Sequence, residues 1–381
     1  AELTNIKDAI KFSKKVKYPV LIRPSYVLSG ANMKVCADEK QLTNFLEKVG
    51  DISADHPAVI SKFEIWAKEI EIDWVAKNGD LVIYAIWEHI ENAWVHSWDA
   101  TIALPAQRLY VETVRRIKTI AKQIVRELHI TGPFNIQFLA KANEIKVIEC
   151  NLRASRSFPF VSKTTKYNFI DIAIKAILWM KVDWRYNTLD LDYVWIKASQ
   201  FSFHRLKWAD PKLWVEMSST WEVWCLWTNI YQAFLKSMIS VWIEAPKKNI
   251  LLSIWWLENK ISFLKSAKRL TKMWYKLFAT KWTADILEKN DIKVKIVDKV
   301  HKNSKKNAVT YMEDWKIDFV INIPSDTKIR QEEESWYLIR RKAVDSSIPM
   351  INDLKVAMLY IKSIDVLNGQ EGIEIKGYSE F

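Results

Sequence analysis

The sequence predicts an α/β fold in two parts, an α+β unit over residues 1–244 and a small α/β domain with a parallel sheet over residues 245–381. Two observations lead to this prediction. Residues 69–75 and 80–87 alternate between apolar and polar side chains, as paired antiparallel strands do. After the sequence APKKN at 245–249, strand patterns alternate with helical ones over about 130 residues, which is typical of a parallel sheet.

The first part mixes helices with strands. Its clearest helix covers residues 111–128, where Val114, Ile117, Ala121 and Val125 belong to one apolar stripe. In order, helices are predicted at 6–16, 40–49 and 111–128, and strands at 18–26, 58–63, 69–75, 80–87, 134–141 and 144–153.

The second part is more regular, because each of its first two strand patterns is followed closely by a helical one. Strands are predicted at 250–254, 276–279, 293–297 and 319–323, and helices at 260–273 and 283–290. Such alternation predicts a separate domain with its own parallel sheet.

Composition excludes several classes of protein. The 381 residues are 49% apolar and 27% charged, which is ordinary for a soluble globular chain. No apolar run reaches the roughly 18 residues of a membrane span, and the charged residues 1–15 lack the apolar centre of a signal peptide. Cys36, Cys150 and Cys225 lie far apart, so neither a disulfide framework nor a zinc site is indicated. We expect a cytoplasmic enzyme or binding protein.

The net charge of +12 raises the question of a nucleic-acid partner. The excess is mostly lysine spread along the whole chain, with short clusters such as residues 302–306. A solvated basic surface explains this pattern better than a nucleic-acid face does, and phosphorylated small molecules would also suit a basic protein. We therefore expect neither a nucleic acid nor a membrane as partner.

The alternation of strand residues places polar side chains together. In the strand at 144–153, Glu149 and Asn151 point to one face, and Asn135 and Gln137 share a face of the strand before it. We expect Glu149 to be buried among apolar neighbours, where a carboxylate requires a cation. That cation is either a bound metal ion or, if Glu149 only forms a salt bridge, the guanidinium of Arg153 or Arg156.

Two tryptophans stand in an unexpected place. The stretch EHIENAWVHSWDATIALPAQ at 88–107 is rich in polar groups, yet Trp94 and Trp98 flank Val-His-Ser inside it. Average usage of about 7% predicts about 27 glycines in a chain of this length. The chain has only 7 glycines but 20 tryptophans, so the missing glycines and the surplus tryptophans are similar in number.

Four segments together resemble the second half of the large chain of carbamoyl phosphate synthetase, in order and in spacing. They are YPVLIRPSYVLSG, EHIENAWVHSWDAT, GPFNIQF and VIECNLRASRSFPFVSK. The resemblance implies that residues 1–244 are part of an ATP-grasp unit and that residues 245–381 are a regulatory domain similar to methylglyoxal synthase. The activity that it implies is phosphorylation of carbamate by ATP, which yields carbamoyl phosphate and ADP.

The resemblance also implies a site. Magnesium or manganese would be held by the oxygen atoms of Gln137, Glu149 and Asn151, and potassium is a further possible cofactor. Carbamate and the transferred phosphoryl group would contact Arg153 and Arg156, with Asn151 as the third catalytic residue. The nucleotide would be bound by Arg23, Lys62, Glu64, Glu69, Trp94, Val95, His96, Ser97, Gln137 and Glu149.

The terminal domain would bind a phosphorylated effector, following the same resemblance. The residues that match the effector pocket of the family are Thr280, Thr283, Lys299, Asn322, Arg340 and Arg341. Their polar groups at strand ends suit an anion. For Arg340 and Arg341, the alternative is a pair of basic side chains on the surface. Ala198 stands where ornithine-responsive relatives have an acidic residue, which argues against activation by ornithine.

Further chains are implied as partners, because the resemblance starts inside the ATP-grasp unit. We expect the N-terminal part of the large chain, which makes carbamate, and a glutaminase subunit or domain. The product would serve pyrimidine or arginine biosynthesis. The alternative function is a non-catalytic module that binds a nucleotide or an effector. Another ATP-grasp ligase, related to biotin carboxylase, is less compatible with NLRASRSFPFVSK and with the terminal domain.

The same relatives have glycine where this chain has tryptophan. Trp94, Trp98, Trp208 and Trp227 match family glycines, as do Trp221, Trp242, Trp274 and Trp282. Our hypothesis is that UGA codons, written here as tryptophan, are read as glycine in the source organism. The rival hypothesis is that the tryptophans are genuine, in which case Trp94 and Trp98 would block the nucleotide site.

Overall fold

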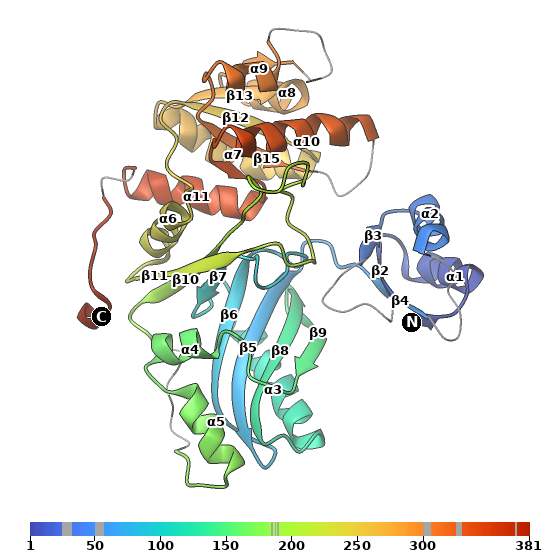
Figure 1. The fold of residues 1–381 in the computed structure, drawn as a ribbon, viewed down its shortest axis with the longest axis vertical. Helices are drawn as coiled ribbons and strands as arrows, with labels where there is room; N and C mark the ends of the chain where they lie inside the picture. Colours follow the sequence, from blue (N-terminus) through green and yellow to red (C-terminus); the bar gives the residue numbers. More distant parts are fainter. Residues whose placement is uncertain are drawn as a thin grey trace.

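The computed structural model describes residues 1–24, 33–49, 57–183, 186, 188, 190–298, 300, 306–324, 330–369 and 372–381. Its secondary structure confirms the predicted α/β fold, with two antiparallel sheets followed by a parallel one (Figure 1). Each predicted helix and strand is present, with ends that differ by a few residues. Among the described residues, no helix combines the length and apolar character that crossing a bilayer requires.

The N-terminal residues form a small unit that lies to one side of the rest in Figure 1. Its antiparallel sheet has the order β1-β4-β2-β3. The strands are β1 (Glu2–Leu3), β2 (Val20–Pro24), β3 (Lys34–Cys36) and β4 (Ala58–Lys62), and helices α1 (Ile6–Val16) and α2 (Glu39–Val49) complete the unit. Ala9 of α1 and Leu42 of α2 pack against Val20 and Ile22, so the unit has its own apolar core.

A seven-stranded antiparallel sheet forms the centre of the molecule. Its order is β11-β10-β7-β6-β5-β8-β9. The strands are β5 (Lys68–Lys77), β6 (Asp80–Asn92), β7 (Ile102–Leu104), β8 (Gly132–Lys141), β9 (Glu144–Asn151), β10 (Val194–Gln200) and β11 (Trp221–Trp227). Helix α3 (Val111–Glu127) covers one face, and α4 (Phe158–Thr165) and α5 (Phe169–Ile177) cover the other.

The last part contains the predicted parallel sheet, in the order β14-β13-β12-β15-β16. Its strands are β12 (Asn249–Ile254), β13 (Lys276–Thr280), β14 (Lys295–Val297), β15 (Phe319–Ile323) and β16 (Met350–Ile351). Its helices are α7 (Leu257–Lys272), α8 (Lys281–Glu288), α9 (Ala308–Glu313), α10 (Arg330–Asp345) and α11 (Leu354–Val366).

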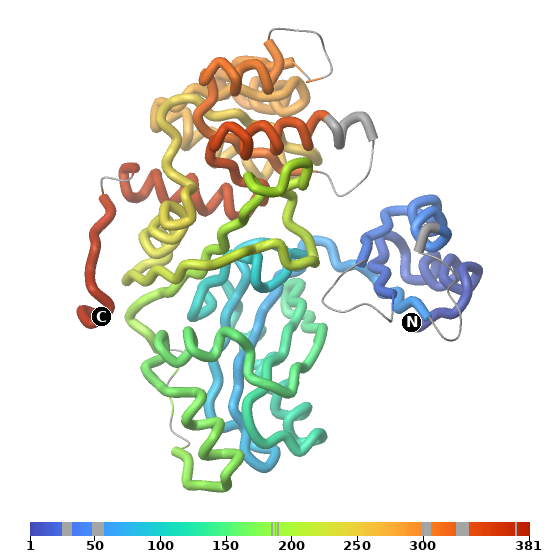
Figure 2. Tube along the Cα trace, in the orientation of Figure 1, coloured from blue at the N-terminus to red at the C-terminus, as the bar shows by residue number. Residues whose placement is uncertain are grey.

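The central and C-terminal parts share one apolar core. Helix α6 (Ile230–Ser240) lies between β10 and α11, and Phe234 of α6 belongs to the same buried cluster as Ile196 and Tyr360. The chain end also returns to the central part, as Figure 2 shows. There Lys166 Nζ donates to the carbonyl of Phe381 at 2.6 Å. The relative placement of these two parts therefore depends on apolar side chains that both parts bury in one cluster.

Two arginines of α10 connect the parallel-sheet domain to the loop at 203–210. Arg340 donates from Nε to Asp210 at 2.6 Å and from Nη1 to Asn322 at 3.1 Å. Arg341 donates from Nη1 to the carbonyls of Leu206 and Ala209. Only 3% of Arg340 and 7% of Arg341 are exposed, so the alternative reading of a surface basic pair is wrong. The hydrogen-bond partners that both arginines have in the loop at 203–210 lie more than 100 residues away in the sequence. Local residue patterns therefore do not reveal that the two arginines are buried.

Replacing Arg340 with methionine is expected to lower the free energy of unfolding by about 3 kcal/mol, because it leaves Asp210 and Asn322 without their donor. Lys281→Met is the control, since Lys281 forms an exposed ion pair with Asp285 one turn along α8. Urea unfolding of both variants measures the difference. Equal midpoints for the two variants would contradict the prediction.

Candidate active site

A cavity of about 590 Å³ opens beside the central sheet and collects seven of the thirteen predicted catalytic and nucleotide-binding residues. It is lined by the predicted residues His96, Ser97, Gln137, Glu149, Asn151, Arg153 and Arg156. Glu71, Asn135 and Lys197 line it as well, and only the position of Asn135 was noted from the sequence. The cavity therefore combines carboxylate and amide oxygens with three cationic side chains.

Strands β8 and β9 hold the oxygen donors in register. Gln137 pairs with Glu149 and Asn135 pairs with Asn151, so all four side chains belong to two alternate rungs of the sheet, separated by the pair of Ile136 and Cys150. Asn151 Nδ2 donates to Glu149 Oε1 at 2.9 Å, which confirms that the two project together. Glu149 itself is exposed, so its expected burial among apolar residues is wrong. The physical reason is that β9 is the edge strand of the sheet.

The turn at 94–99 is held to the sheet by a buried lysine. Lys197 of β10 donates from Nζ to the carbonyls of Ser97 at 2.8 Å and of Trp98 at 2.6 Å. Burial lowers the pKa of Lys197 to about 8, although Glu91 and other carboxylates oppose the shift. A buried ammonium group that binds two carbonyl oxygens keeps the backbone of this turn in one position.

A buried aspartate fixes the far end of the same turn. Asp99 accepts from the backbone N–H of Ser218 at 2.9 Å and of Ser219 at 3.0 Å. At the near end, the N–H of His96 donates to the carbonyl of Trp214 at 2.9 Å. The polar residues of the motif thus serve first to shape the loop against β10 and the 214–219 segment.

His96 faces the cavity with one ring nitrogen already engaged. The backbone N–H of Trp98 donates to His96 Nδ1 at 3.2 Å, so a neutral ring carries its proton on Nε2. Burial lowers the pKa of His96, which favours this neutral form near pH 7. The ring can therefore donate one hydrogen bond to a ligand in the cavity.

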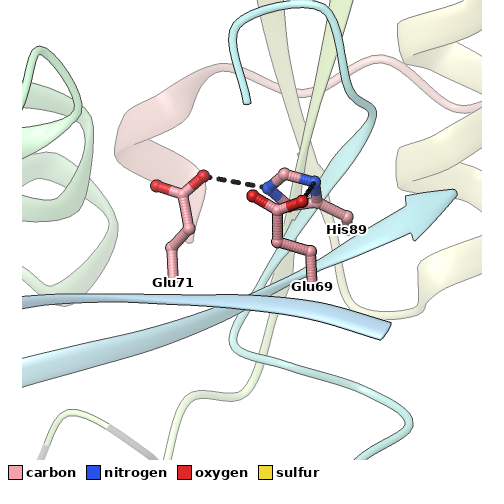
Figure 3. Close-up of side chains that lie close together, drawn as sticks. All are labelled: Glu69, Glu71 and His89. Atoms are coloured by element: carbon pink, nitrogen blue, oxygen red, sulfur yellow. Dashed lines mark hydrogen bonds and ion pairs between the residues drawn. The ribbon is translucent and has the colours of Figure 1, made fainter. Parts of the chain in front are cut away.

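Three buried ionisable groups lie together at the start of β5 and the end of β6 (Figure 3). His89 Nε2 is 2.9 Å from Glu71 Oε1, and His89 Nδ1 is 3.9 Å from Glu69 Oε2. Burial opposes a charge on His89, but the two carboxylates outweigh it and raise the pKa of the imidazole. Burial raises the pKa of Glu69 to about 7, whereas the hydrogen bond from His89 lowers that of Glu71 despite its burial.

Two further buried acids lie near this cluster. Asp73 accepts from Asn135 Nδ2 at 3.0 Å, and burial raises the pKa of Asp73 to about 7. Glu91 accepts from the backbone N–H of Thr101 at 3.0 and 2.9 Å. Burial, and then the nearby Asp353 at the start of α11, raise the pKa of Glu91 to about 7.

The raised pKa of Glu91 predicts a pH dependence of folding. Between pH 4.5 and about 7 the folded chain keeps a proton that the unfolded chain releases, so the free energy of unfolding falls as pH rises through this window. For Glu91 alone the fall is up to about 3 kcal/mol. Glu91→Gln is expected to flatten the decline when urea unfolding is followed from pH 5 to pH 8.

The control for this experiment is Glu112→Gln, which alters an exposed carboxylate on α3. We expect its pH profile to match that of the unchanged chain. A profile of Glu91→Gln as steep as the original would contradict the assignment of the titration to Glu91.

A second cavity, of about 380 Å³, lies between the N-terminal unit, the 92–95 segment and the C-terminal domain. The predicted nucleotide residues Glu64, Trp94 and Val95 line it. The Trp94 indole stacks on Phe63, with ring centres 5.6 Å apart, and lies 6.0 Å from the ring of Trp214. Aromatic side chains therefore fill much of its wall.

The other predicted nucleotide residues occupy the edges of these cavities. Lys62 Nζ donates to the carbonyls of Lys17 and Tyr18, so its ammonium group is already bound to the N-terminal unit. Glu64 forms ion pairs with Lys141 and Lys146. Arg23 is exposed near the end of β2, and neither Arg23, Lys62 nor Glu69 lines either of the two cavities.

The predicted effector residues lie mostly at one edge of the parallel sheet, where β12, β13 and β15 end. Thr283 Oγ1 lies 3.4 Å from Thr280 Oγ1 and also accepts from the N–H of Ile254. Asn322 is fully buried and accepts from Arg340. Lys299 lies outside the described residues. Since Arg341 contacts backbone carbonyls and Asp345, its place in an effector pocket stays a prediction.

Comparison with known proteins agrees with this arrangement. Residues 1–182 match the carbamoyl-phosphate synthase L chain ATP binding domain, and residues 262–352 match the MGS-like domain. The chain is homologous to the large chain of carbamoyl phosphate synthetase. The resemblance noted in the sequence is thereby confirmed.

The relatives of this carbamoyl phosphate synthetase homologue are much longer proteins. It is 46% identical over 377 residues to the multifunctional protein pyr1-3 of Dictyostelium discoideum, covering 98% of this chain and 17% of the relative. It is 42% identical over 373 residues to the mitochondrial carbamoyl-phosphate synthase (ammonia) of Homo sapiens, covering 95% and 25%. Biotin carboxylase from Campylobacter jejuni aligns over 53% of this chain and 47% of its own, with 18% identity and a TM-score of 0.43.

Sequence reasoning missed several buried groups of the site. Glu71 and Asp73 alternate with apolar residues along β5, and this spacing could have placed them on one face with Glu69. Glu91 of β6 belongs to the polar stretch at 88–107, but its burial was not predicted. No sequence signal pointed to Lys197, because β10 follows the turn by about 100 residues in the chain and meets it only through the sheet.

Proposed function

We propose that this chain performs the second phosphorylation of carbamoyl phosphate synthesis, in which ATP phosphorylates carbamate to give carbamoyl phosphate and ADP. One observation carries the proposal: a single cavity joins Gln137, Glu149 and Asn151 to Arg153 and Arg156. Phosphoryl transfer between anions needs oxygen ligands for metal ions and cations beside the transferred group.

The oxygen atoms of Gln137, Glu149 and Asn151 would hold magnesium or manganese, since all three are hard donors on adjacent strands. A bound divalent ion would neutralise charge on the nucleotide phosphates. The hydrogen bond from Asn151 Nδ2 to Glu149 leaves the amide oxygen of Asn151 available. The donor set fits such an ion, and potassium is a further candidate cofactor.

The two arginines would hold the substrates in line. Bidentate guanidinium groups suit the planar carboxylate of carbamate and the oxygens of the transferred phosphoryl group. Arg156 lies 4.8 Å from the centre of the Trp98 ring, which places its guanidinium beside the 94–99 turn. His96 would donate from Nε2 to a nucleotide phosphate. Carbamate oxygen attacks the terminal phosphorus of ATP, and ADP leaves.

The greater length of the relatives supports a wider assembly. We propose that the N-terminal part of a large chain supplies carbamate and that a glutaminase subunit or domain supplies ammonia. The parallel-sheet domain over 245–381 would bind a phosphorylated effector at the edge that holds Thr280, Thr283, Asn322 and Arg340. The product would enter pyrimidine or arginine biosynthesis, in the cytoplasm.

The reverse reaction tests the proposal. The chain with glycine at 94 and 98 is combined with the N-terminal part of the large chain, carbamoyl phosphate, ADP and magnesium, and ATP formation is measured. We expect ATP to form, and Arg153→Lys to remove most of it because an ammonium group cannot bind two oxygens in one plane. Arg205→Lys, an exposed arginine outside the cavity, is the control. Absence of ATP would refute the catalytic function.

A non-catalytic module that binds an effector is the second candidate. The observation in its favour is that the Trp94 and Trp98 indoles lie in the walls of the two cavities where a nucleotide would bind. If effector binding persists while no nucleotide binds to any form of the chain, this second function is the correct one.

A further inference from the structure

Seven tryptophans have a backbone conformation that suits glycine. Among the described residues fifteen non-glycine residues have positive φ, and seven of them are tryptophan. They are Trp66 (66°), Trp179 (56°), Trp208 (70°), Trp242 (67°), Trp256 (34°), Trp274 (66°) and Trp315 (53°). A β-carbon makes this region unfavourable, and a bulky side chain at positive φ is a rare outlier. Chance does not place one residue type at nearly half of these positions.

Four of the seven end helices in the same way. Trp179, Trp242, Trp274 and Trp315 each lie two residues beyond the last residue of α5, α6, α7 and α9. After α7, the N–H of Trp274 donates to the carbonyl of Thr271 at 3.0 Å, and the next N–H donates to that of Leu270 at 3.1 Å. The same pair of bonds follows the other three helices. This is the Schellman motif, whose left-handed position is usually glycine.

Packing does not compensate for the conformation at the most exposed of these positions. Trp274 is 91% exposed, Trp208 83% and Trp315 75%. A genuine tryptophan usually gains stability by burying a large apolar surface, and these indoles bury little. Side-chain contacts of these three indoles therefore do not offset the energetic cost of the left-handed backbone.

A separate set of tryptophans is buried without hydrogen bonds. The indole N–H groups of Trp74, Trp87, Trp195 and Trp224 are inaccessible to solvent and have no hydrogen-bond partner within the part of the chain that the structure describes. Buried indoles normally find an acceptor, because an unpaired buried N–H is costly. These four side chains thus misfit the core in a different way from the exposed seven.

We infer that the working protein has glycine at positions 66, 179, 208, 242, 256, 274 and 315, and that one codon written here as tryptophan is read as glycine. The inference rests on backbone conformation and does not depend on the catalytic proposal. Glycine at position 66 would also let the segment between β4 and β5 bend where the N-terminal unit meets the central sheet.

A reading of tryptophan as glycine would also change the sheet edge proposed for the effector. The rings of Trp256, Trp282 and Trp336 all lie within 6.4 Å of the ring of Trp255, just beyond the end of β12. Ser253 of β12 pairs with Asn322 of β15 in this sheet, and the Ser253 Oγ and Asn322 Nδ2 atoms are buried with no hydrogen-bond partner among the described residues. Glycine at position 256 would remove one ring from this cluster.

Peptide mass spectrometry on the protein purified from its source organism is the direct test. Peptides that span the seven positions should have the mass of glycine at each of them. Tryptophan at these positions would overturn the inference. This result is independent of any activity assay, so it stands apart from a failure of the proposed catalysis.

Stability of the recombinant chain gives a second test. Trp274→Gly should raise the melting temperature by about 2 °C or more, because glycine relieves the left-handed strain. Trp274→Ala is the matched control: it removes the same exposed indole but keeps a β-carbon, so it should show no such gain. If both variants shift the melting temperature equally, the backbone argument is wrong.

Discussion

Replacing Glu149 with glutamine is expected to lower the rate of ATP formation from carbamoyl phosphate and ADP by about 10²- to 10³-fold. The substitution keeps the size of the side chain and removes the one carboxylate among the three predicted metal ligands on β8 and β9. A neutral ligand set binds a divalent ion less tightly, so the variant should also need more magnesium to reach half its maximal rate. Steady-state rates over a magnesium series measure both effects.

The matched control is Glu144→Gln. Glu144 is an exposed carboxylate at the other end of β9, outside the cavity. We expect its rate and its magnesium dependence to equal those of the unchanged chain. Should Glu149→Gln behave like this control, the assignment of Glu149 to the metal would be wrong.

Replacing Trp94 and Trp98 together with glycine is expected to tighten magnesium–ADP binding by about 10²-fold. Each indole occupies the wall of a cavity, and accommodating a ligand beside an extra side chain costs about 1–3 kcal/mol. The backbone hydrogen bonds of the turn involve Lys197, Asp99 and main-chain groups, so they persist in the variant. Isothermal titration calorimetry with ADP and magnesium gives the affinity.

Trp315→Gly is the control for this measurement. Position 315 also has a left-handed backbone, but it follows α9 and lies outside both cavities. Its affinity for ADP should stay unchanged. Equal affinities for the double variant and the control would show that the indoles do not obstruct the nucleotide, which would remove the observation in favour of the non-catalytic module.

The site was partly visible in the sequence because strand alternation is a local property. Glu149 and Asn151 project together, as their spacing of two predicts, and the hydrogen bond between them confirms it. The burial of Glu149 was predicted wrongly, since the apolar run around it suggested an interior strand. Whether a strand lies inside a sheet or at its edge depends on pairings with distant segments, which no local pattern contains.

For the helices, too, local patterns predict some features and distant contacts decide others. Residues 111–128 were predicted as a helix from their apolar stripe, and α3 covers Val111–Glu127. The stripe packs on the central sheet through Ile117, Ala121 and Val125. By contrast, the joint core of α6 and α11 could not be predicted, because each helix is apolar on more than one side and the partner of each side is chosen only in three dimensions.

The residues alone were enough to predict the order of helices and strands, the two kinds of sheet, the family and the turn that faces the cavity. These follow from periodicity and from residues that are close together in the chain. Three features became visible only in the folded chain: Lys197 holds this turn, Glu71 and His89 form a buried pair, and seven tryptophans have a backbone suited to glycine. Burial, the pKa values of ionisable groups and backbone strain depend on contacts between segments far apart in the chain.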